Sequence, residues 1–257
     1  MGLATALLIL VGCGDSSASD GGDTDGGGAG STTAGPGVTS GTGGAPPIDP
    51  GCDGDPTPHS GDATYYDFAD GSGNCSFPAT PNDLMVGAMN HTDYADSAVC
   101  GACADVTGPN GTIHIRIVDQ CPECPVGNID LSPEAFQQIS PLEAGKVHID
   151  WVYSACDVGG SVVYHFKDGS NPYWTAVQIR NHTYAIAKVE ARVPPADYAE
   201  LPRFDYNYFI AESGLGDGPY DFRVTDVAGH VIEDTGIPLL DDGDAPGASQ
   251  FPVCTGN

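Results

Sequence analysis

Cysteines are the residues of this chain whose type and spacing most clearly predict chemistry. Nine occur among 257 residues, and four of them form two Cys-x-x-Cys pairs, Cys100 with Cys103 and Cys121 with Cys124. This spacing fits a zinc ribbon, whereas an even set of cysteines in an exported chain favours disulfides. With Cys13 set aside, the even set comprises Cys52, Cys75, Cys100, Cys103, Cys121, Cys124, Cys156 and Cys254. We expect up to four disulfides and no bound metal or cofactor, with zinc as the alternative.

The N-terminal residues indicate export. Residues 1–13 form an apolar run that is too short to cross a bilayer as a mature helix but fits the apolar core of a signal peptide. The run ends in Leu10-Val11-Gly12-Cys13, which resembles the bacterial lipobox, although no Lys or Arg precedes it. We expect a signal peptide with a lipidated Cys13; the alternative is an ordinary secretory signal. The chain is therefore expected to be exported, either to the bacterial cell surface or outer membrane as a lipoprotein, or as a secreted protein.

Residues 14–55 are rich in Gly, Ser, Thr and Asp and contain few apolar side chains. Such a segment cannot bury enough surface to offset the entropy that is lost on ordering. We therefore expect a disordered linker that tethers the rest of the chain.

The charge of the chain argues against several classes of partner. Asp and Glu number 35 against 8 Lys and Arg, which gives a formal net charge of −27. Nucleic acids and anionic membranes are bound through Lys and Arg, so neither is expected to bind directly. The same charge opposes anionic polymers such as pectin and peptidoglycan. We expect a monomer that contacts a membrane only through its lipid anchor.

The elements that position these side chains in the first half of the ordered chain are predicted to be short strands and one helix. Residues 112–118 and 147–153 alternate between apolar and polar side chains, which is typical of strands with one buried face. A helix is expected from Pro133 to about Ile139, because Ser132 is a favourable N-cap and proline suits the first helical position.

The second half is predicted to be a β-sandwich. Apolar residues alternate in several short segments, and turn sequences such as Asp226–Gly229 separate them. The side chains expected to face inward are Val162, Tyr164 and Phe166, then Val177 and Ile179, then Ala187, Val189 and Ala191, then Phe222 and Val224.

Motifs in both halves resemble those of expansins. In the first half they are Gly61-Asp-Ala-Thr-Tyr-Tyr66, Cys100-Gly-Ala-Cys103, Val118-Asp-Gln-Cys-Pro122 and Asn128-Ile-Asp-Leu-Ser-Pro-Glu-Ala-Phe136. In the second half they are Gly169-Ser-Asn-Pro-Tyr-Trp174, Ala176-Val-Gln-Ile-Arg-Asn-His182 and Phe204-Asp-Tyr-Asn-Tyr-Phe209. They follow the order of the family across residues 59–240, and the ordered set is far more specific than any single motif. By this resemblance the chain is identified as a bacterial expansin.

The resemblance implies an all-β fold. It comprises a six-stranded double-psi β-barrel in residues 56–157, similar to the barrel of family-45 endoglucanases, and an immunoglobulin-like, cellulose-binding β-sandwich in residues 158–257. It also implies a set of disulfides, which leaves Cys52–Cys254 as a fourth pair. The implied pairs are Cys75–Cys100, Cys103–Cys156 and Cys121–Cys124.

The resemblance also assigns roles to side chains of the barrel. Asp130 matches the general acid of the endoglucanases, and Asp119 matches a second acidic residue of the expansin groove. Thr64 and Tyr66 match groove residues that contact the glucan. We expect both carboxylates to accept hydrogen bonds from sugar hydroxyls. The alternative is a structural role for each, Asp119 in a turn and Asp130 beside the helix.

One departure from the endoglucanase pattern bears on hydrolysis. The base of those enzymes follows Thr-x-Tyr-x-Asp, whereas here Phe68 holds the last position and Asp67 comes one residue early. A shift of one residue along a strand turns a side chain to the opposite face, so Asp67 is expected to miss the groove unless a bulge returns it. An inverting glycosidase needs an acid and a base, so we expect no hydrolytic activity.

In the sandwich, Tyr173, Trp174 and Tyr206 match the flat aromatic platform of bacterial expansins, and Lys167 matches a basic residue that supports it. Aromatic rings offer flat area to the apolar C–H faces of a glucan. The expected function is non-hydrolytic loosening of plant cell walls through binding of cellulose or xyloglucan. The alternatives are a weak endoglucanase, a lytic transglycosylase of peptidoglycan and a purely adhesive protein.

Overall fold

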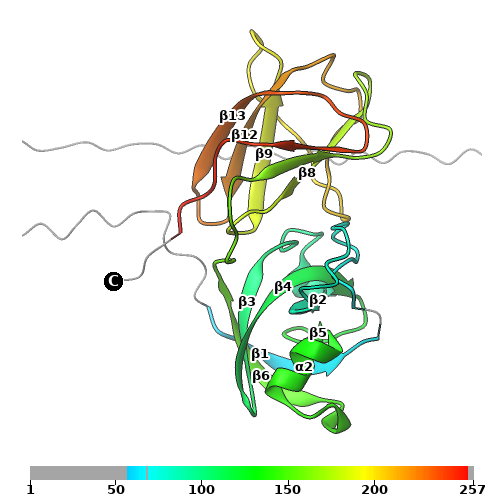
Figure 1. The fold of residues 1–257 in the computed structure, drawn as a ribbon, viewed down its shortest axis with the longest axis vertical. Coiled ribbons are helices and arrows are strands. Elements are labelled where there is room, and N and C mark those ends of the chain that lie inside the picture. Colours follow the sequence, from blue (N-terminus) through cyan, green and yellow to red (C-terminus); the bar gives the residue numbers. More distant parts are fainter. Residues whose placement is uncertain (1–56, 68, 254–257) are drawn as a thin grey trace, which may run out of the picture. The chain divides into compact units, whose positions relative to one another are not determined.

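The structure is a computed structural model that describes residues 57–67 and 69–253. The predicted signal peptide with Cys13, the linker and the pair Cys52–Cys254 lie outside the described residues. The described residues form a closed barrel and, after it in the chain, two further β-sheets (Figure 1). The predicted fold class is therefore confirmed.

Six strands close the barrel, and their order around it differs from their order in the chain. The order is β1-β5-β2-β4-β3-β6, in which β1 pairs with β5, and β2 with β4, in parallel. Parallel neighbours cannot be joined by a tight hairpin, so strands that are distant in sequence become neighbours. The strands are β1 (His59–Tyr65), β2 (Val86–Asn90), β3 (Cys103–Gly108), β4 (Gly111–Cys121), β5 (Ile129–Leu131) and β6 (Val147–Ser154).

The alternating segments of the sequence supply the barrel core. In β4 the side chains of Ile115 and Ile117 are buried, and in β6 those of Ile149 and Trp151 are buried. Each pair lies two residues apart, as strand geometry requires for one face. The alternation predicted from the sequence is confirmed here.

The predicted helix is α2 (Pro133–Ile139). The Ser132 hydroxyl accepts a 2.9 Å hydrogen bond from the N–H of Ala135 and so caps the first turn. The other helical turns of the described residues are α1 (His91–Tyr94) and the 3-10 turn η1 (Leu142–Ala144). No helix within the described residues has the length and apolar character needed to span a bilayer.

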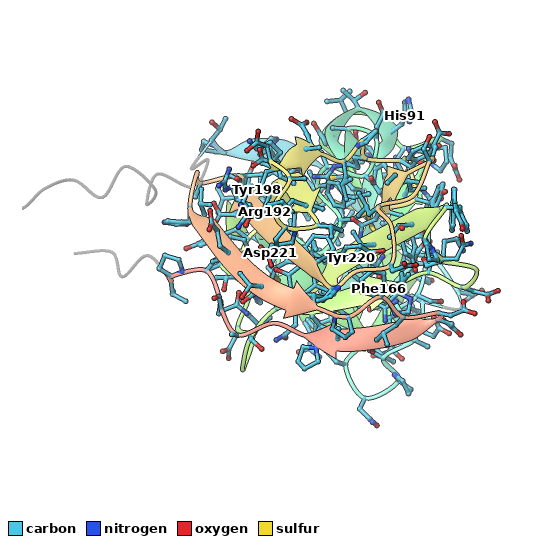
Figure 2. The ribbon with its side chains drawn as sticks, turned by 90° about the horizontal axis from the view of Figure 1, so that it is seen from above. His91, Phe166, Arg192, Tyr198, Tyr220 and Asp221 are labelled. Atoms are coloured by element: carbon cyan, nitrogen blue, oxygen red, sulfur yellow. A yellow bond between two sulfur atoms is a disulfide. The ribbon has the colours of Figure 1, made fainter. Side chains whose placement is uncertain are left out.

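Two four-stranded sheets form the sandwich, with orders β10-β9-β12-β13 and β11-β8-β7-β14. Aromatic rings from both sheets fill the core: Tyr164 and Phe222 stack at 4.7 Å between ring centroids, and Phe166 lies 6.1 Å from Tyr220 (Figure 2). The strands are β7 (Val163–Phe166), β8 (Thr175–Arg180), β9 (Ile186–Arg192), β10 (Ala199–Glu200), β11 (Phe209–Ala211), β12 (Tyr220–Asp226), β13 (Val231–Ile237) and β14 (Gly243–Pro246).

The prediction that Ala187 faces the sandwich core is wrong. Ala187 in β9 is exposed, whereas the adjacent Ile186 is buried. The pairing of β12 with β9 shifts register at this point, from Thr225 opposite Lys188 to Asp226 opposite Ile186. This irregularity reverses the alternation, so Ile186 enters the core in place of Ala187.

Two arginine side chains of β9 and β12 lie over one tyrosine ring. Tyr198 lies against Arg192 and Arg223, whose guanidinium carbons are 4.4 and 4.0 Å from the ring centroid. Asp221 accepts a 3.0 Å hydrogen bond from Arg192 (Figure 2). Both guanidinium groups are thus held over the Tyr198 ring, whose buried hydroxyl has no hydrogen-bond partner among the described residues.

Three disulfides lie within the described residues, and they are the pairs that the expansin resemblance implies. They are Cys75–Cys100, Cys103–Cys156 and Cys121–Cys124. The four cysteines of the zinc-ribbon spacing are therefore all in disulfides, and the alternative of a zinc ribbon is wrong.

One contact in the barrel is too close for a side chain. A Cβ atom added to Gly61 in β1 would lie 2.3 Å from the carbonyl oxygen of Gly127, which in turn accepts a 2.8 Å hydrogen bond from the Trp151 indole. Backbone cannot retreat as a flexible side chain can, so only glycine fits at position 61.

We predict that Gly61→Ala destabilises the barrel by about 3 kcal/mol or more, because the added methyl group must displace the backbone at Gly127. Urea unfolding would measure the loss. Gly159→Ala is the matched control, since a Cβ there meets nothing within 4 Å. Equal stability of the two variants would contradict this prediction.

Candidate functional site

Strand register places the predicted groove residues in one row across the barrel. Thr64 of β1 lies opposite Asp130 of β5, Asp130 lies opposite Ala88 of β2, and Ala88 lies opposite Asp119 of β4. Residues directly opposite one another point to the same face of a sheet. Two strand spacings separate Asp130 from Asp119, which puts their Cα atoms about 10 Å apart. The row therefore has a carboxylate on each side of a small alanine. We call Thr64, Asp130, Ala88 and Asp119 the carboxylate row.

Asp130 is held in a state that favours its protonated form. Its carboxylate accepts a 2.5 Å hydrogen bond from the Thr64 hydroxyl, which lowers its pKa. Burial raises the pKa and is the largest effect, and the charges of Glu123 and Asp119 add to it. The net pKa of Asp130 is raised from its ordinary value.

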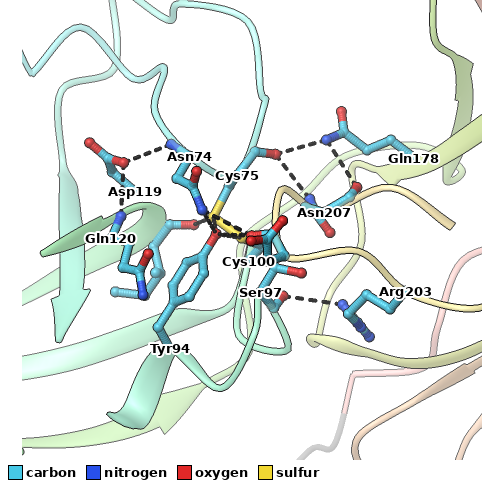
Figure 3. Close-up of a disulfide and its surroundings, with 12 residues drawn as sticks. Asn74, Cys75, Tyr94, Ser97, Cys100, Asp119, Gln120, Gln178, Arg203 and Asn207 are labelled. Atoms are coloured by element: carbon cyan, nitrogen blue, oxygen red, sulfur yellow. Dashed lines mark hydrogen bonds between the residues drawn. A yellow bond between two sulfur atoms is a disulfide. The ribbon is translucent and has the colours of Figure 1, made fainter. Parts of the chain in front are cut away.

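Asp119 is held by two backbone N–H groups, one from the loop between β1 and β2 and one from its own strand. One carboxylate oxygen accepts hydrogen bonds from the N–H groups of Asn74, at 2.6 Å, and Gln120, at 2.8 Å (Figure 3). Gly73 allows this approach, because a Cβ there would lie 2.4 Å from the Asp119 side chain. The second oxygen of Asp119 is left for another donor.

Tyr66 lies close to both carboxylates of the row. Its N–H donates to the Leu131 carbonyl, which extends the pairing of β1 with β5 by one residue. Burial raises the pKa of Tyr66, and the charges of Asp119 and Asp130 raise it further. Its hydroxyl is buried and has no hydrogen-bond partner among the described residues.

The expected reason for excluding Asp67 from the groove is wrong. Strand alternation applies only as far as the strand continues, but β1 ends at Tyr65 and Asp67 is exposed in the turn that follows. The position of Asp67 is therefore set by a turn and not by the pleat of a strand.

The aromatic residues of the sandwich lie at one end of the outer face of the sheet β11-β8-β7-β14. Trp174 and Tyr206 are partly buried and both pack on a small cluster formed by Ala176, Tyr208 and Ile210. Tyr173 beside them is 82% exposed. The side-chain oxygen of Asn171 accepts hydrogen bonds from the N–H groups of Tyr173, at 2.9 Å, and Trp174, at 3.2 Å, and so shapes the loop that carries both rings. We call Tyr173, Trp174 and Tyr206 the aromatic surface.

Tyr208 is the residue of this surface that the sequence reasoning missed. It is buried, lies 5.8 Å from the Tyr206 ring, and carries Lys167 over its own ring at 5.5 Å. Lys167 thus touches the aromatic surface through Tyr208, as a cation over an aromatic face. The signal was present in the sequence: Tyr206 and Tyr208 are two residues apart.

We predict that Thr64→Val raises the pKa of Asp130 further, because it removes the hydrogen bond that opposes the effect of burial. Carboxyl ¹³C NMR titration would measure the change. Thr64→Ser keeps the hydroxyl and should titrate as the wild type does. A Thr64→Val protein whose Asp130 titrates unchanged would show that this hydroxyl does not control the carboxyl group.

Comparison with known proteins shows similarity across both halves of the chain. A family model described as lytic transglycolase matches residues 59–151. Expansin-YoaJ of Bacillus subtilis (strain 168) is 33% identical over 203 residues, which are 76% of this chain and 87% of that protein. Expansin-like protein 1 of Dictyostelium discoideum is 31% identical over 192 residues, 70% of this chain and 66% of that protein.

Solved structures agree. The crystal structure of the apo expansin of Clavibacter michiganensis matches with a TM-score of 0.72 and 35% identity, and covers 77% of this chain and 100% of that one. A mutant of the same expansin in complex with cellohexaose matches with a TM-score of 0.72 and 34% identity over the same shares. With relatives aligned over most of their length and the row of carboxylates and the aromatic surface on one chain, this protein belongs to the expansin family.

Proposed function

We propose that this chain binds a cellulose-type β-glucan along the carboxylate row and the aromatic surface, and that it loosens contacts between glucan chains without cleaving them. The observation that carries the proposal is the row itself, in which a carboxyl group of raised pKa, Asp130, lies beside a carboxylate that the backbone holds, Asp119. The Clavibacter michiganensis expansin in complex with cellohexaose supports a glucan as the ligand.

Both hydrogen bonding and aromatic stacking would contribute to binding of the glucan. A glucan carries hydroxyl groups at its edges and apolar C–H groups on its faces. Asp130, the second oxygen of Asp119 and the Tyr66 hydroxyl would bind sugar hydroxyls. Trp174 and Tyr206 would stack on the C–H faces. Each sugar hydroxyl bound in the row is one that can no longer bond to a neighbouring glucan chain.

The absence of a paired base supports binding without cleavage. An inverting glycosidase activates water with a carboxylate placed roughly 6.5–9.5 Å from its acid. By the expansin resemblance, the position of that base is taken by Phe68, and Asp67 lies exposed in a turn. Asp119 could serve in its place only with the one oxygen that the backbone leaves free.

Weak endoglucanase activity is the second candidate. Asp119 and Asp130 lie on one face of the barrel with Ala88 between them, so Asp119 is the carboxylate that would act as the base. The family model described as lytic transglycolase raises cleavage of peptidoglycan as a further alternative, but it matches the barrel alone. A net charge of −27 also opposes an anionic polymer.

The cellular setting is part of the proposal. Three disulfides favour a compartment outside the cytoplasm. We propose that residues 56–157 and 158–257 act as two domains of an exported monomer, at the bacterial surface through a lipidated Cys13 or secreted, with residues 14–55 as the tether. Cellulose or xyloglucan, being uncharged, would be the substrate.

The test of this function measures wall extension and the release of reducing sugars on the same cellulose-rich wall sample. We predict extension with no soluble sugar from the wild type. Asp130→Asn should abolish extension while leaving cellulose binding within about twofold, because the sandwich supplies most of the stacking area. Asp150→Asn, at an exposed carboxylate of β6, is the control and should behave as the wild type. Sugar that accumulates with time would assign the chain to the endoglucanases, and extension without loss in Asp130→Asn would remove Asp130 from the mechanism.

A second prediction concerns the aromatic surface. Trp174→Ala should weaken binding to cellulose about tenfold, which corresponds to about 1.4 kcal/mol, because it removes the largest ring of that surface. A pull-down isotherm on insoluble cellulose would measure it. The control is Tyr198→Ala, which truncates a ring stacked on Arg192 and Arg223 in the other sheet. An isotherm of Trp174→Ala that matches the control would show that glucan binds elsewhere.

A further inference from the structure

The loop between β1 and β2 contacts the carboxylate row through one of its residues, Asn74. The Asn74 N–H donates to the Asp119 carboxylate at 2.6 Å, and the next N–H, of Cys75, donates to the Val118 carbonyl at 3.1 Å. The backbone of the loop is therefore fixed on β4, directly beside the carboxylate that we assign to glucan binding (Figure 3).

The side chain of Asn74 extends from the row to the aromatic surface. Its amide nitrogen donates to the Tyr94 hydroxyl and to the Asp205 carbonyl, both at 2.9 Å. Tyr94 donates to the same carbonyl at 3.1 Å. Asp205 immediately precedes Tyr206, so three consecutive hydrogen bonds connect Asp119 to the backbone that carries a ring of the aromatic surface.

Tyr94 remains a donor in this arrangement at any ordinary pH. It is buried, and burial raises its pKa to about 12, with the hydrogen bond from Asn74 acting in the opposite direction. The neighbouring segment is held in the same manner: the Ser97 hydroxyl donates to the Phe204 carbonyl at 2.8 Å, and Arg203 donates to the Ser97 carbonyl at 3.2 Å (Figure 3).

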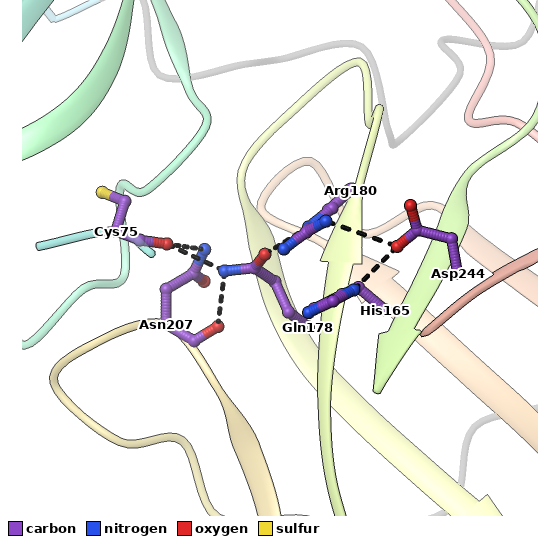
Figure 4. Close-up of polar contacts among 6 residues, drawn as sticks. All are labelled: Cys75, His165, Gln178, Arg180, Asn207 and Asp244. Atoms are coloured by element: carbon purple, nitrogen blue, oxygen red, sulfur yellow. Dashed lines mark hydrogen bonds and ion pairs between the residues drawn. The ribbon is translucent and has the colours of Figure 1, made fainter. Parts of the chain in front are cut away.

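A second set of hydrogen bonds between the loop and the sandwich lies beside the first. The Cys75 carbonyl accepts hydrogen bonds from the side-chain amides of Gln178, at 2.8 Å, and Asn207, at 3.2 Å. The Gln178 amide cannot be reversed, because its oxygen accepts a 2.5 Å hydrogen bond from Arg180, which Asp244 binds in turn at 3.3 Å (Figure 4). Two adjacent residues of the loop are thus bonded to the sandwich.

We propose that Asn74 is a positioning residue that fixes the register between Asp119 and Tyr206, so that a single glucan chain occupies the carboxylate row and the aromatic surface together. The proposal rests on the proposed function. Two binding sites joined rigidly act on one ligand with a high effective concentration, and a loose joint loses that advantage without altering either site.

Asparagine suits this position because it supplies three donors without charge. Its backbone N–H serves Asp119, and its amide nitrogen serves Tyr94 and Asp205. This loop already carries Asp67, Asp70 and Asp83, and Asp119 and Asp205 accept hydrogen bonds from Asn74. Another carboxylate there would add repulsion and remove the donors.

The test is Asn74→Ala, which removes the side-chain tie but keeps the N–H that holds Asp119. Asn74 is exposed, so the barrel should fold as before. We expect the affinity for cellohexaose to fall at least tenfold and the affinity for cellotriose, which is half as long, to stay within twofold. Isothermal titration calorimetry would measure both. Ser72→Ala is the control in the same loop, because the Ser72 hydroxyl bonds to Asp70 within that loop.

The dependence on chain length separates positioning from a purely structural role. Equal losses for both oligosaccharides, or a lowered melting temperature that accounts for them, would overturn the proposal, and so would unchanged affinity for cellohexaose. A wild-type protein that binds neither oligosaccharide nor cellulose would instead remove the proposed function itself. Preserved binding to cellotriose with a loss confined to cellohexaose is the outcome that supports a positioning role.

Discussion

The small residue Ala88 lies at the centre of the barrel's chemistry, because β2 pairs with β5 on one side and β4 on the other. Both pairings are made through this alanine, and both bring an aspartate to its level. A shift of one residue in either pairing would turn an aspartate inward. The pairing of β2 with β4 shifts register here, from Gly87 opposite Ile117 to Ala88 opposite Asp119, and this irregularity sets the level of Asp119. A Cβ atom added to Gly87 would meet Ile115, Ile129 and Leu131 of the barrel interior, so the spacing of the carboxylates also depends on how β2 packs against the core.

The core also accounts for the unlike states of the two aspartates. Asp130 is partly buried and has a hydroxyl as its hydrogen-bond donor, so burial dominates and its pKa rises. Asp119 accepts hydrogen bonds from two backbone N–H groups, that of Asn74 in the loop and that of Gln120 in its own strand. The same residue type thus has a raised pKa in one strand and is held by backbone N–H groups two strands away. Environment makes the difference, as it does wherever paired carboxyl groups divide their roles.

Local sequence signals predicted the elements well and the site only in part. Alternation in β4 and β6 and the cap at Ser132 depend on neighbours in the chain, and these predictions were confirmed. Ala187 failed because a register irregularity with a distant strand reversed the pattern. The bond between Thr64 and Asp130 joins residues 66 apart, and that between Asn74 and Asp205 joins residues 131 apart. Asn74 donates to a backbone carbonyl. Every residue has a backbone carbonyl, so no residue type in the sequence identifies the partner of Asn74.

Under the proposed function, the protein loosens glucan contacts by binding them with a rigid surface and not by cleaving glycosidic bonds. A protein that cleaves no bond can disrupt glucan contacts only with the free energy of its own binding. If the joint between its two binding sites were flexible, the protein would change shape on binding and the glucan would not. The contacts at the loop of Asn74 and Cys75 meet this demand, since the disulfide Cys75–Cys100 fixes the loop on the barrel and side-chain amides fix it on the sandwich. Those contacts use backbone carbonyls as acceptors, whose positions are set by the fold and not by rotamers. The row and the aromatic surface are therefore held to each other by side-chain amides that donate to these carbonyls.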